Sequence, residues 1–507
     1  MKYNEMIKSN VTRNHEGGEA FPLSPELELY TAVVTTALSN MTYETSDKRI
    51  KRICQLIQKV NPEFVAQLAI YTREQMNLRS IPLLLVVELA KIHNGDNLVA
   101  RAVNRIVLRA DEIMELLTCY QVRNPSENSI KKLGHLSRQI QKGLALAFNR
   151  FDEYQFAKYN NTNRVVKMRD VLFIVHPKAK DDSQQKLFDK IVLNELATPY
   201  TWEAELSALG QKQFDTEDEK LQAFSNKWQG LIASGQLGYM AILRNLRNIL
   251  HCKNLPGGTI NSVIARLTSF NAIAKAHQLP FRYLAAYREV QKIDSFWTQS
   301  ILEALEEAVE KTAGNIAGFD ESTCILVAAD VSGSMFSAIS EKSRIQNYDI
   351  GLLLAMMLKS RCKQVVSGMF GDTWKIINLP TEHILANVQE MYKREGEVGY
   401  STNGYKVIDW MVENKIIIDK IMIFTDCQMW NSNNTCDSIR LSWHKYLKIS
   451  PKANLYLFDL CGYGQAPLSM AEPGVSLIAG WNDKIFDILA ALEKGNNALA
   501  EIKDIEV

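Results

Sequence analysis

The 507-residue sequence lacks the features that define several large classes of protein. No apolar run approaches the ~20 residues that a membrane-spanning helix needs. The N-terminal stretch MKYNEMIKSN lacks the apolar core of a signal peptide. The eight cysteines are scattered and never form a CxxC pair, which argues against a zinc site and against a disulfide framework. We therefore expect a cytoplasmic protein with reduced thiols.

The sequence motifs of common enzymes are also missing. There is no Walker A glycine loop, no GxSxG nucleophile elbow and no HExxH helix. The carboxylate clusters that two-metal nucleases use do not occur around the polar turns described below. We therefore expect no catalytic residue. A hydrolase stays open only as a third possibility, which metal-dependent turnover of RNA by the purified protein would reveal.

The formal net charge is only +1, but the charge is unevenly distributed. From residue 129 to residue 180 there are eleven Lys or Arg against three acids, a local charge of +8 that the rest of the chain offsets with −7. A basic block inside a neutral protein indicates an electrostatic footprint for nucleic acid.

Residues 24–313 carry one helical pattern after another, and strand-like alternation is almost absent there. Ser24 with Pro25, and Asn61 with Pro62, are N-cap and first-turn pairs. Many helices of roughly 10–16 residues joined by short polar turns predict an α-solenoid of HEAT-like pairs. Because no exact repeat period is found, an ordinary globular helical domain stays open.

The pattern changes at residue 324, after an expected loose leader (1–23) and an expected linker (314–323). Apolar strands are expected at 324–329, 365–370, 373–379, 420–425, 454–460 and 475–480. Helices are expected between them, at about 345–362, 382–393, 403–413, 433–447 and 482–494. Alternating strands and helices predict a doubly wound, mostly parallel sheet over 324–507.

A D-x-S-x-S turn directly follows the first of these strands and places Asp330, Ser332 and Ser334 at its carboxyl end. Open α/β sheets bind ligands at this end of their strands. Carboxylate and hydroxyl oxygens are hard donors that suit Mg²⁺ or a similar divalent ion. The alternative is a Ser/Asp turn that caps the next helix.

Two later stretches extend this pattern. Thr402 lies in the polar loop GYSTNG, and Asp426 ends the apolar strand KIMIFTD. The order of strand with DxSxS, loop with Thr and strand with TD resembles the von Willebrand A domain and its metal-ion-dependent adhesion site. The resemblance implies hydroxyl ligands from Ser332, Ser334 and Thr402, with Asp330 and Asp426 holding the ion directly or through water. One coordination position would remain for a partner's carboxylate. Ser401 is an alternative to Thr402, because the family more often reads Gly-Gly-Thr-Asp in this loop.

A second resemblance covers Gly134 to Lys178. The segment GHLSRQIQKGLALAFNRFDEYQFAKYN, followed by VKMRDVLFIVHPK, resembles the TROVE module of the Ro ribonucleoprotein autoantigens and their bacterial orthologues. AILRNLRNI (241–249) resembles a later segment of that family. The resemblance implies a monomeric ring of HEAT-like repeats closed by the von Willebrand A domain. Single-stranded 3′ ends of structured or misfolded RNA would enter its hole, and small noncoding Y RNAs would bind its basic outer surface. An exoribonuclease is an implied partner.

The resemblance and the helical spacing together predict the RNA-binding residues. The residues that match the family's Y-RNA-binding segment are Lys158, Arg164, Lys167, Arg169, His176 and Lys178. Two pairs share a helical face and could meet phosphates or line the hole: Arg138 with Lys142, and Arg244 with Arg247. Further candidates for base contacts are Tyr154, Phe156, Tyr159, Asn245 and Asn248. The alternatives are solvated surface charges, core aromatics, and a metal-dependent protein-adhesion scaffold that binds no RNA.

Overall fold

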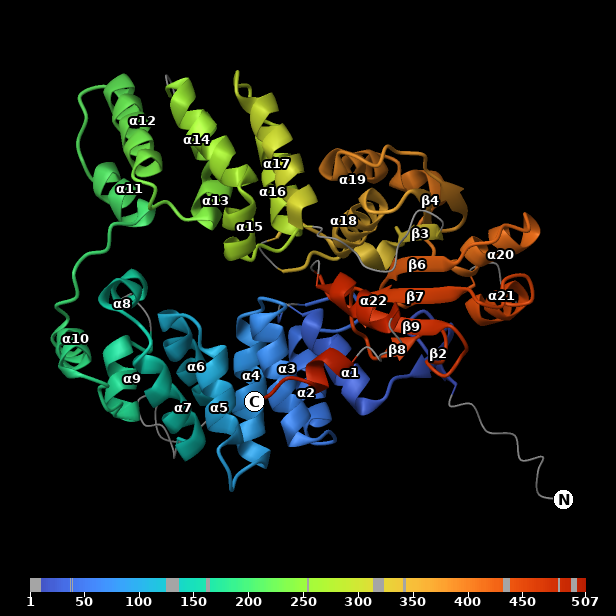
Figure 1. Ribbon diagram of the computed structural model, residues 1–507, viewed down its shortest axis with the longest axis horizontal. Coiled ribbons are helices and arrows are strands. Elements are labelled where there is room, and N and C mark those ends of the chain that lie inside the picture. The colour runs from blue at the N-terminus through green and yellow to red at the C-terminus, as the bar shows by residue number, and fades with distance from the viewer. Residues whose placement is uncertain are drawn as a thin grey trace. The chain divides into compact units, whose positions relative to one another are not determined.

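The computed structural model describes residues 11–36, 38, 40–124, 136–160, 165–252, 255–312, 323–340, 343–431, 438–481, 484–493 and 499–507. The chain forms two compact units (Figure 1). One contains Met1–Leu56 and Leu267–Glu501, and the other contains Ile57–Arg266 and Ile502–Val507. We call them the α/β unit and the helical unit. The predicted combination of a helical repeat region with a doubly wound parallel sheet is confirmed.

In the helical unit the described residues form helices and no strand. The helices are α3 (Pro62–Glu74), α4 (Ser80–Ile92), α5 (Leu98–Ile106), α6 (Ala110–Arg123), α7 (Arg138–Phe148), α8 (Glu153–Tyr159), α9 (Met168–Val175), α10 (Asp182–Leu193), α11 (Trp202–Gly210), α12 (Glu217–Ala233) and α13 (Tyr239–Leu250). Three more helices cross the boundaries of the unit: α2 (Ser46–Ile57), α14 (Gly257–Thr268) and α23 (Ala500–Lys503).

Neighbouring helices of this unit stack in two layers (Figure 1). Helix α5 packs between α3 and α7, and α7 packs on α9; in the other layer α6 packs between α4 and α8. Contacts between alternate helices are the arrangement expected of HEAT-like pairs, in which each pair buries its apolar face against the next. The solenoid prediction is therefore favoured over an ordinary globular helical domain.

The tightest helix contact in the unit depends on a glycine. A Cβ atom on Gly143 of α7 would lie 2.6 Å from Cβ of Val103 and 2.8 Å from the carbonyl oxygen of Ala100, both on α5. Such distances are shorter than van der Waals contact, so only glycine lets the two helices approach this closely.

A buried ion-pair cluster fixes the first helices of the unit. Glu112 is fully buried, accepts hydrogen bonds from the backbone N–H groups of Leu108 (2.8 Å) and Arg109 (3.1 Å), and pairs with Arg73 (2.8 Å). Arg79 approaches the same carboxylate at 3.4 Å. A buried carboxylate needs this number of partners, because an unpaired buried charge is costly.

The α/β unit is built on a six-stranded sheet of order β5-β4-β3-β6-β7-β9. Its strands are β3 (Cys324–Asp330), β4 (Gln364–Phe370), β5 (Trp374–Ile376), β6 (Lys420–Thr425), β7 (Asn454–Asp459) and β9 (Val475–Ala479). All neighbouring strands are parallel except β4 and β5. The helices and 3₁₀ turns between them are η1 (Gly333–Phe336), α18 (Asn347–Ser360), α19 (Ile384–Lys393), η2 (Glu395–Val398), α20 (Tyr405–Glu413), α21 (Ile439–Tyr446) and α22 (Ile485–Glu493).

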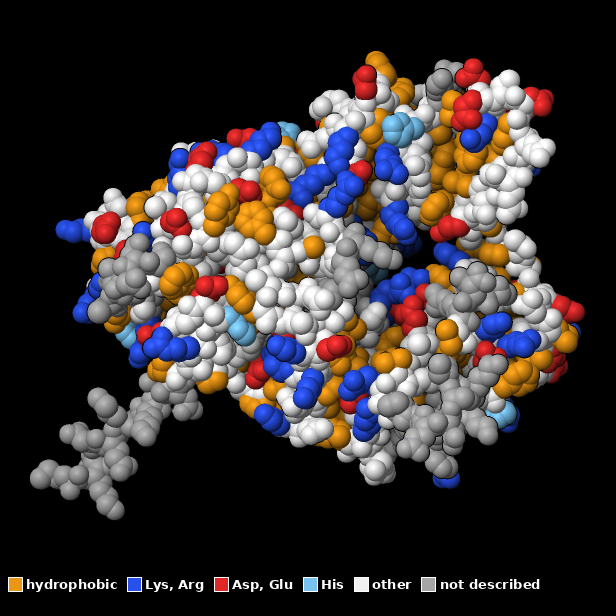
Figure 2. Space-filling model, turned by 180° about the vertical axis from the view of Figure 1, so that it is seen from behind, with side chains coloured by type: hydrophobic (Ala, Val, Ile, Leu, Met, Phe, Trp, Pro, Cys, Tyr) orange, Lys and Arg blue, Asp and Glu red, His pale blue; other side chains and the backbone are white. Residues whose placement is uncertain are grey.

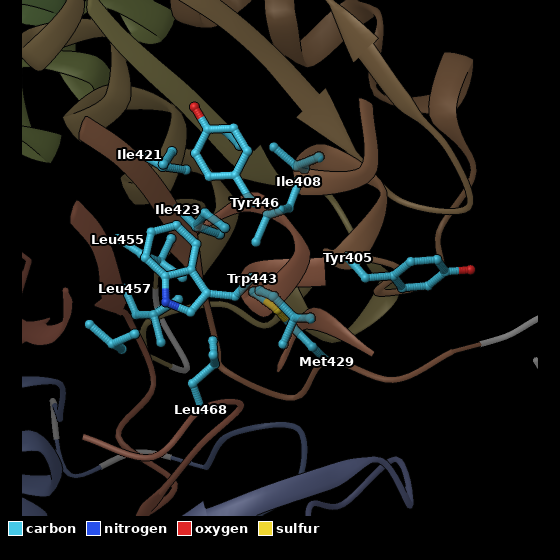
Figure 3. Close-up of a cluster of buried hydrophobic side chains, with 14 of the residues drawn as sticks. Tyr405, Ile408, Ile421, Ile423, Met429, Trp443, Tyr446, Leu455, Leu457 and Leu468 are labelled. Atoms are coloured by element: carbon cyan, nitrogen blue, oxygen red, sulfur yellow. The ribbon is translucent and has the colours of Figure 1, made fainter. Parts of the chain in front are cut away.

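Apolar side chains fill both faces of this sheet. On one face Trp443 and Tyr446 of α21 pack on strand residues such as Ile423 and Leu457 (Figure 3). Their polar atoms are satisfied: Trp443 Nε1 donates to the carbonyl of Pro473 (3.1 Å), and Tyr446 Oη accepts from the N–H of Ile418 (2.7 Å). On the other face α18 covers β3 and β6. Strands covered on both faces explain the nearly continuous apolar runs in the sequence.

The prediction of a loose leader is wrong for the described residues 11–23. Strands β1 (Thr12–Arg13) and β2 (Glu19–Pro22) form a small antiparallel sheet with β8 (Gln465–Ala466). Ala20 and Phe21 are buried, at 0% and 6% exposed, so this segment folds to remove its apolar residues from water. Helix α1 (Pro25–Val34) follows and contacts β9.

The compact units cut across the expected domain boundaries. Helices α15 (Phe270–Ala276), α16 (Phe281–Val290) and α17 (Thr298–Thr312) belong to the α/β unit. Arg288 of α16 forms a bidentate pair with the buried Asp349 of α18 (2.9 and 2.5 Å). Glu306 of α17 accepts from the N–H groups of Leu385 (2.8 Å) and Ala386 (2.7 Å) at the start of α19.

The C-terminal residues belong to the helical unit, although they were expected to form part of the sheet domain over 324–507. Helix α23 (Ala500–Lys503) leads into residues that pack in the helical unit, where Nε2 of Gln67 donates to the carbonyls of Lys503 (2.7 Å) and Ile505 (3.1 Å). The expected linker lies outside the described residues apart from Thr323. Within the described ranges, no helix is both long enough and apolar enough to cross a membrane.

Replacing Gly143 with alanine should destabilise the helical unit. The new Cβ meets α5 at 2.6 Å, and overpacking costs about 1–3 kcal/mol. The gain in helix propensity is at most about 1 kcal/mol. Urea unfolding should therefore show a lower free energy of unfolding for Gly143→Ala. The matched control is Gly230→Ala on α12, where nothing lies within 4 Å of the added atom and stability should rise. An equal rise in both variants would contradict the close approach of α5 and α7.

Candidate metal centre and nucleic-acid interface

Strands β3 and β6 are parallel neighbours, so the residues at their carboxyl ends meet at one edge of the sheet. Asp330 ends β3 and Asp426 directly follows β6; they are 1% and 0% exposed. Backbone hydrogen bonds bring the third loop to the same place, because the N–H of Gly333 donates to the carbonyl of Tyr400 (2.9 Å) and that of Trp430 to the carbonyl of Thr402 (3.3 Å). We call this the metal edge.

The side chains at the metal edge are held by short hydrogen bonds. Oδ1 of Asp330 accepts from the N–H of Ser332 (2.9 Å), and Oδ2 accepts from the hydroxyl of Thr425 (2.6 Å). The hydroxyl oxygens of Ser332 and Ser334 lie 3.3 Å apart. Oδ1 of Asp426 accepts from the N–H of Gln428 (3.0 Å). Three of the five predicted ligands, Asp330, Ser332 and Ser334, are thus linked to one another by hydrogen bonds.

Electrostatics at the edge favour a cation. Burial raises the pKa of Asp330 to about 6, and burial together with the nearby Asp330 raises the pKa of Asp426 to about 7. Oδ2 of Asp426 is buried and has no hydrogen-bond partner. Two buried carboxylates with neighbouring hydroxyls and one unused oxygen fit a hard divalent ion, whose charge would favour their ionised forms.

The structure also bears on the choice between Ser401 and Thr402. The N–H of Ser401 donates to Oδ1 of Asp372 (2.8 Å), and its side chain bonds to the same carboxylate, which lowers the pKa of Asp372. Thr402 is buried, at 3% exposed. Because the hydroxyl of Ser401 is already used by Asp372, the geometry favours Thr402 as the ligand from this loop.

Sequence reasoning missed a third buried carboxylate near this edge. Asp459 ends β7, is fully buried, and accepts from the N–H groups of Cys461 (2.9 Å) and Gly462 (2.7 Å). Burial raises its pKa to about 6, while Arg49 and Arg52 oppose that rise. The signal was available, since Asp459 ends an apolar strand as Asp330 does. In the described part of the chain no three His, Cys, Asp or Glu side chains could together hold a metal ion, so an ion at this edge would also need hydroxyl ligands.

The predicted RNA-binding residues lie on four segments of the helical unit. Arg138 and Lys142 are exposed on α7, Lys158 is exposed on α8, Arg169 is exposed on α9 after the half-buried Lys167, and Arg244 and Arg247 are exposed on α13. His176 and Lys178 are exposed just after α9, where His176 ends the helix in the left-handed conformation (φ 49°). Arg164 lies outside the described residues.

Most of these charges are not neutralised by acids. Arg169 lies 3.9 Å from Asp170, a long and exposed pair of little energetic weight. Nζ of Lys142 donates to the amide oxygen of Asn97 (2.8 Å). Within the described ranges no acidic group pairs with Arg138, Lys142, Lys158, Lys178 or Arg244. On the face drawn in Figure 2, Lys and Arg side chains recur across the surface with acidic ones among them.

Two predicted cations from distant segments meet at one cavity of the helical unit. Lys158 and Arg244 line a cavity of about 260 Å³. The other basic and aromatic residues that line it are Arg109, Tyr154, Tyr159, Tyr200 and Trp202. We call it the aromatic cavity. Cations beside aromatic faces are the combination with which proteins bind single-stranded nucleic acid.

Cation–π contacts order the walls of this cavity. The guanidinium of Arg109 lies 4.6 Å from the ring centroid of Tyr159. Nζ of Lys158 lies 5.6 Å from the Tyr159 ring and 5.9 Å from the Tyr154 ring. The contributions of Arg109, Tyr200 and Trp202 could not be read from the sequence, because they lie outside the basic block and only the fold brings them together.

Two other predicted base contacts prove to be structural. Asn245 is 3% exposed; its Nδ2 donates to the carbonyl of Ala241 (2.8 Å), and its Oδ1 accepts from Asn248 (2.9 Å). Phe156 is fully buried against Phe148, with ring centroids 5.9 Å apart. For these two side chains the structure therefore favours the alternative reading, in which they belong to the packing of the helices.

Comparison with known proteins divides the chain into two family regions. Residues 27–227 and 194–317 match the TROVE domain family, and residues 324–492 match the Ro60 vWA domain family. The crystal structure of the Deinococcus radiodurans RO (RSR) protein has a similar fold, with a TM-score of 0.57 at 16% identity over 93% of this chain and 100% of that chain.

Two curated relatives carry the name Telomerase protein component 1. The Mus musculus protein is 23% identical over 351 residues, which are 53% of this chain and 13% of that protein. The Rattus norvegicus protein is 22% identical over 323 residues, 48% of this chain and 12% of that protein. The matched segments therefore span only about an eighth of the length of these relatives.

Magnesium should stabilise the protein more at pH 7.5 than at pH 5. Raised carboxyl pKa values mean that the metal-free folded state holds protons which the unfolded state has lost, so its stability falls as the pH rises from about 4 through 7. A bound cation replaces those protons. Mg²⁺ at 100 times its dissociation constant should add about 2.7 kcal/mol at pH 7.5. Thermal unfolding in EDTA and in Mg²⁺ at both pH values measures this difference.

The control for this experiment is Asp426→Asn. It removes the unpartnered carboxylate oxygen while keeping the shape of the side chain, so the melting temperature should no longer respond to Mg²⁺. A wild-type melting temperature that ignores Mg²⁺ at pH 7.5, or an equal response in the variant, would contradict the metal site.

Proposed function

This chain belongs to the TROVE family, and we propose that it is the RNA-binding protein of a ribonucleoprotein that acts in RNA quality control, maturation or decay. Its targets are the single-stranded 3′ ends of structured or misfolded RNA, together with a small noncoding RNA of the Y type. The observation that carries this proposal is the aromatic cavity, where Lys158, Arg244 and Arg109 stand beside exposed or partly exposed aromatic rings inside the TROVE region.

The chemistry of the cavity suits bases that are not paired. A base in a duplex is stacked on its neighbours, whereas a base in a single strand can stack on a protein ring at a gain of about 1–3 kcal/mol. Tyr154 is 47% exposed and stands beside the ammonium group of Lys158, so one side chain can stack while the other meets the phosphate. Arg244 supplies a second charge from α13.

The exposed cations of α7 to α9 extend the binding surface along the backbone of an RNA. Arg138 and Lys142 are four residues apart on α7, so they share a face, and Lys178 follows α9. Such side chains make contacts with phosphates that carry affinity without sequence preference. We assign the small noncoding RNA to this surface.

At the metal edge the same proposal places a divalent cation, most suitably Mg²⁺. Asp330, Ser332, Ser334, Thr402 and Asp426 would hold it. Because hydroxyls outnumber carboxylates, the ion would keep most of its positive charge and attract a carboxylate from a protein partner, for which an exoribonuclease is our candidate. The site would serve docking, and we propose no enzymatic reaction for it.

A second candidate function is a metal-dependent protein-adhesion scaffold without RNA binding. It is favoured by the metal edge alone, whose polar cluster is complete within the α/β unit. The RNA-binding function depends on the aromatic cavity, whereas the adhesion function depends on the metal edge. Variants of each site therefore distinguish the two functions.

Tyr154→Ala and Arg244→Ala should weaken RNA binding in different ways. Loss of a stacking ring costs about 1–3 kcal/mol per base, which weakens affinity about 5- to 150-fold at every salt concentration. Loss of a phosphate contact should instead lower the slope of log affinity against log salt by about 0.7. Fluorescence anisotropy with an RNA duplex that carries a single-stranded 3′ tail, between 50 and 200 mM salt, measures both.

The matched control is Lys220→Ala on α12, an exposed lysine of the same unit that pairs with Glu217 at 3.2 Å. Its affinity and salt slope should equal those of the wild type. Binding that does not change with salt, or a tailless duplex that competes equally well, would refute the RNA-binding proposal.

The double variant Asp330→Ala/Ser332→Ala should bind RNA as the wild type does, because both residues lie outside the helical unit. The adhesion scaffold predicts instead that the main protein partner is lost and that the wild type binds no RNA. Anisotropy and co-purification from cell extract, with circular dichroism to check folding, distinguish the two. A tenfold or greater loss of RNA affinity in a folded double variant would overturn the separation of the sites.

A further inference from the structure

The N-terminal segment, whose first part was expected to be a loose leader, contacts the metal edge from two sides within the α/β unit. On the side of β6, Nδ2 of Asn14 donates to the carbonyl of Met429 (2.6 Å), and the N–H of His15 donates to Oε1 of Gln428 (2.9 Å). Gln428 in turn donates its own N–H to Asp426 (3.0 Å). A single residue, Gln428, therefore connects His15 to the predicted metal ligand Asp426.

On the side of β3, the contact is with a predicted ligand itself. The hydroxyl of Thr42 donates to the backbone carbonyl of Ser334 (2.9 Å) and also contacts the hydroxyl of Ser337. The next residue, Tyr43, lies close to the side chains of Ser334 and Asp426, and its hydroxyl donates to Oε1 of Glu16. Because its proton goes to Glu16, the oxygen of Tyr43 keeps its lone pairs for the Ser334 side.

Ring packing holds Tyr43 in this position. The His15 ring stacks on it with centroids 5.0 Å apart and planes 2° apart. The ring of Tyr463 meets both of them edge-on, at 5.4 Å from Tyr43 and 5.5 Å from His15. Rings from three segments of the chain thus fix the phenol, in the stacked and edge-on arrangements that aromatic rings favour.

The turn that carries Glu16 is itself built against the edge. Oδ1 of Asn14 accepts from the N–H groups of Glu16 (3.1 Å) and Gly18 (2.8 Å), which closes the turn. A Cβ atom on Gly18 would lie 2.3 Å from the carbonyl oxygen of Met429, so only glycine lets the turn come this close. The contact between segment and edge is therefore specific in shape.

The low solvent exposure of the predicted ligands limits the access of a partner to them. The predicted ligands are all nearly inaccessible to solvent: Asp330 1%, Ser332 2%, Ser334 8%, Thr402 3% and Asp426 0% exposed. A carboxylate from another protein cannot reach oxygen atoms that are covered in this way. Docking therefore needs a movement, and the segment that contacts the edge from both sides is the candidate for it.

We propose that the chain closes its own metal centre, with Tyr43, supported by Glu16, standing where a docking partner's carboxylate would otherwise bind. An outside carboxylate then binds only when residues 14–16 and 42–43 are displaced, so the site is self-inhibited. This inference rests on the metal centre proposed above. It adds that docking is conditional and that residues 14–16 and 42–43 control it.

The test uses Mn²⁺ in place of Mg²⁺, with full-length protein, and measures the water-proton relaxation caused by the bound ion. This relaxation reports how many exchanging water molecules the ion holds. Tyr43→Phe removes the oxygen at the site and keeps the stacked ring, so the bound ion should gain an inner-sphere water. Millimolar acetate should then lower the relaxation in Tyr43→Phe and leave the wild type unchanged. Glu16→Gln should give a smaller change in the same direction.

The matched control is Tyr463→Phe, which removes a phenol oxygen from the same ring cluster without touching Ser334; its relaxation should equal that of the wild type. Thermal unfolding confirms that each variant is folded. If the wild type and Tyr43→Phe give equal relaxation and neither responds to acetate, the proposal that Tyr43 closes the site is overturned. The proposed metal centre is not affected by that outcome. If the wild type does not bind Mn²⁺, or if Asp426→Asn binds it equally well, both the closure and the metal centre are overturned.

Discussion

The burial of two like charges, Asp330 and Asp426, is the constraint on which the α/β unit depends. Neither carboxylate can be ionised cheaply in an apolar interior, and each raises the cost for the other. The surrounding chain is arranged to reduce that cost, with backbone N–H groups and the Thr425 hydroxyl as donors. What remains is one buried oxygen of Asp426 without a donor. A sheet that only needed stability would have placed apolar residues at these strand ends, so the pair supports the proposal of a bound cation.

The position of the helices around this sheet shows why sequence domains and compact units differ. The family regions meet between residues 317 and 324, yet α15 to α17 lie before that boundary and fold with the sheet. The reason is electrostatic: the buried Asp349 needs Arg288, and the N-terminus of α19 takes its acceptor, Glu306, from α17. Breaking either interaction would leave a buried charge or unsatisfied N–H groups. The two family regions are therefore joined by interactions that neither can replace alone.

Much of this could be predicted from the sequence because the signals were local. An apolar run that ends in Asp predicts both a strand and the polar group at its end, and this held for Asp330 and Asp426. Exposed cations at helical spacing, such as Arg138 and Lys142, were also local. The aromatic cavity was not predictable, since Arg109, Tyr200 and Trp202 are unremarkable alone and meet only in the fold. The N-terminal segment was misjudged for the same reason: Ala20 and Phe21 lie in a strand that forms only where β1 pairs with Ala20 and β8 pairs with Phe21.

The two candidate sites share one physical principle, which a third cluster makes clear by contrast. Arg73 and Glu112 are as buried as the residues of the metal edge, but each has its opposite charge at 2.8 Å. Their role is structural, because the pair holds α3 against α6. Among the described residues, no positive side chain pairs with Asp330 or Asp426 at the metal edge, and no acidic one forms an ion pair with Arg244, although Glu203 lines the same cavity. A fold that tolerates uncompensated charge at a fixed place is less stable than it could be. The sign of that charge supports the ligand proposed for each site: a divalent cation at the sheet, and a polyanion at the helices.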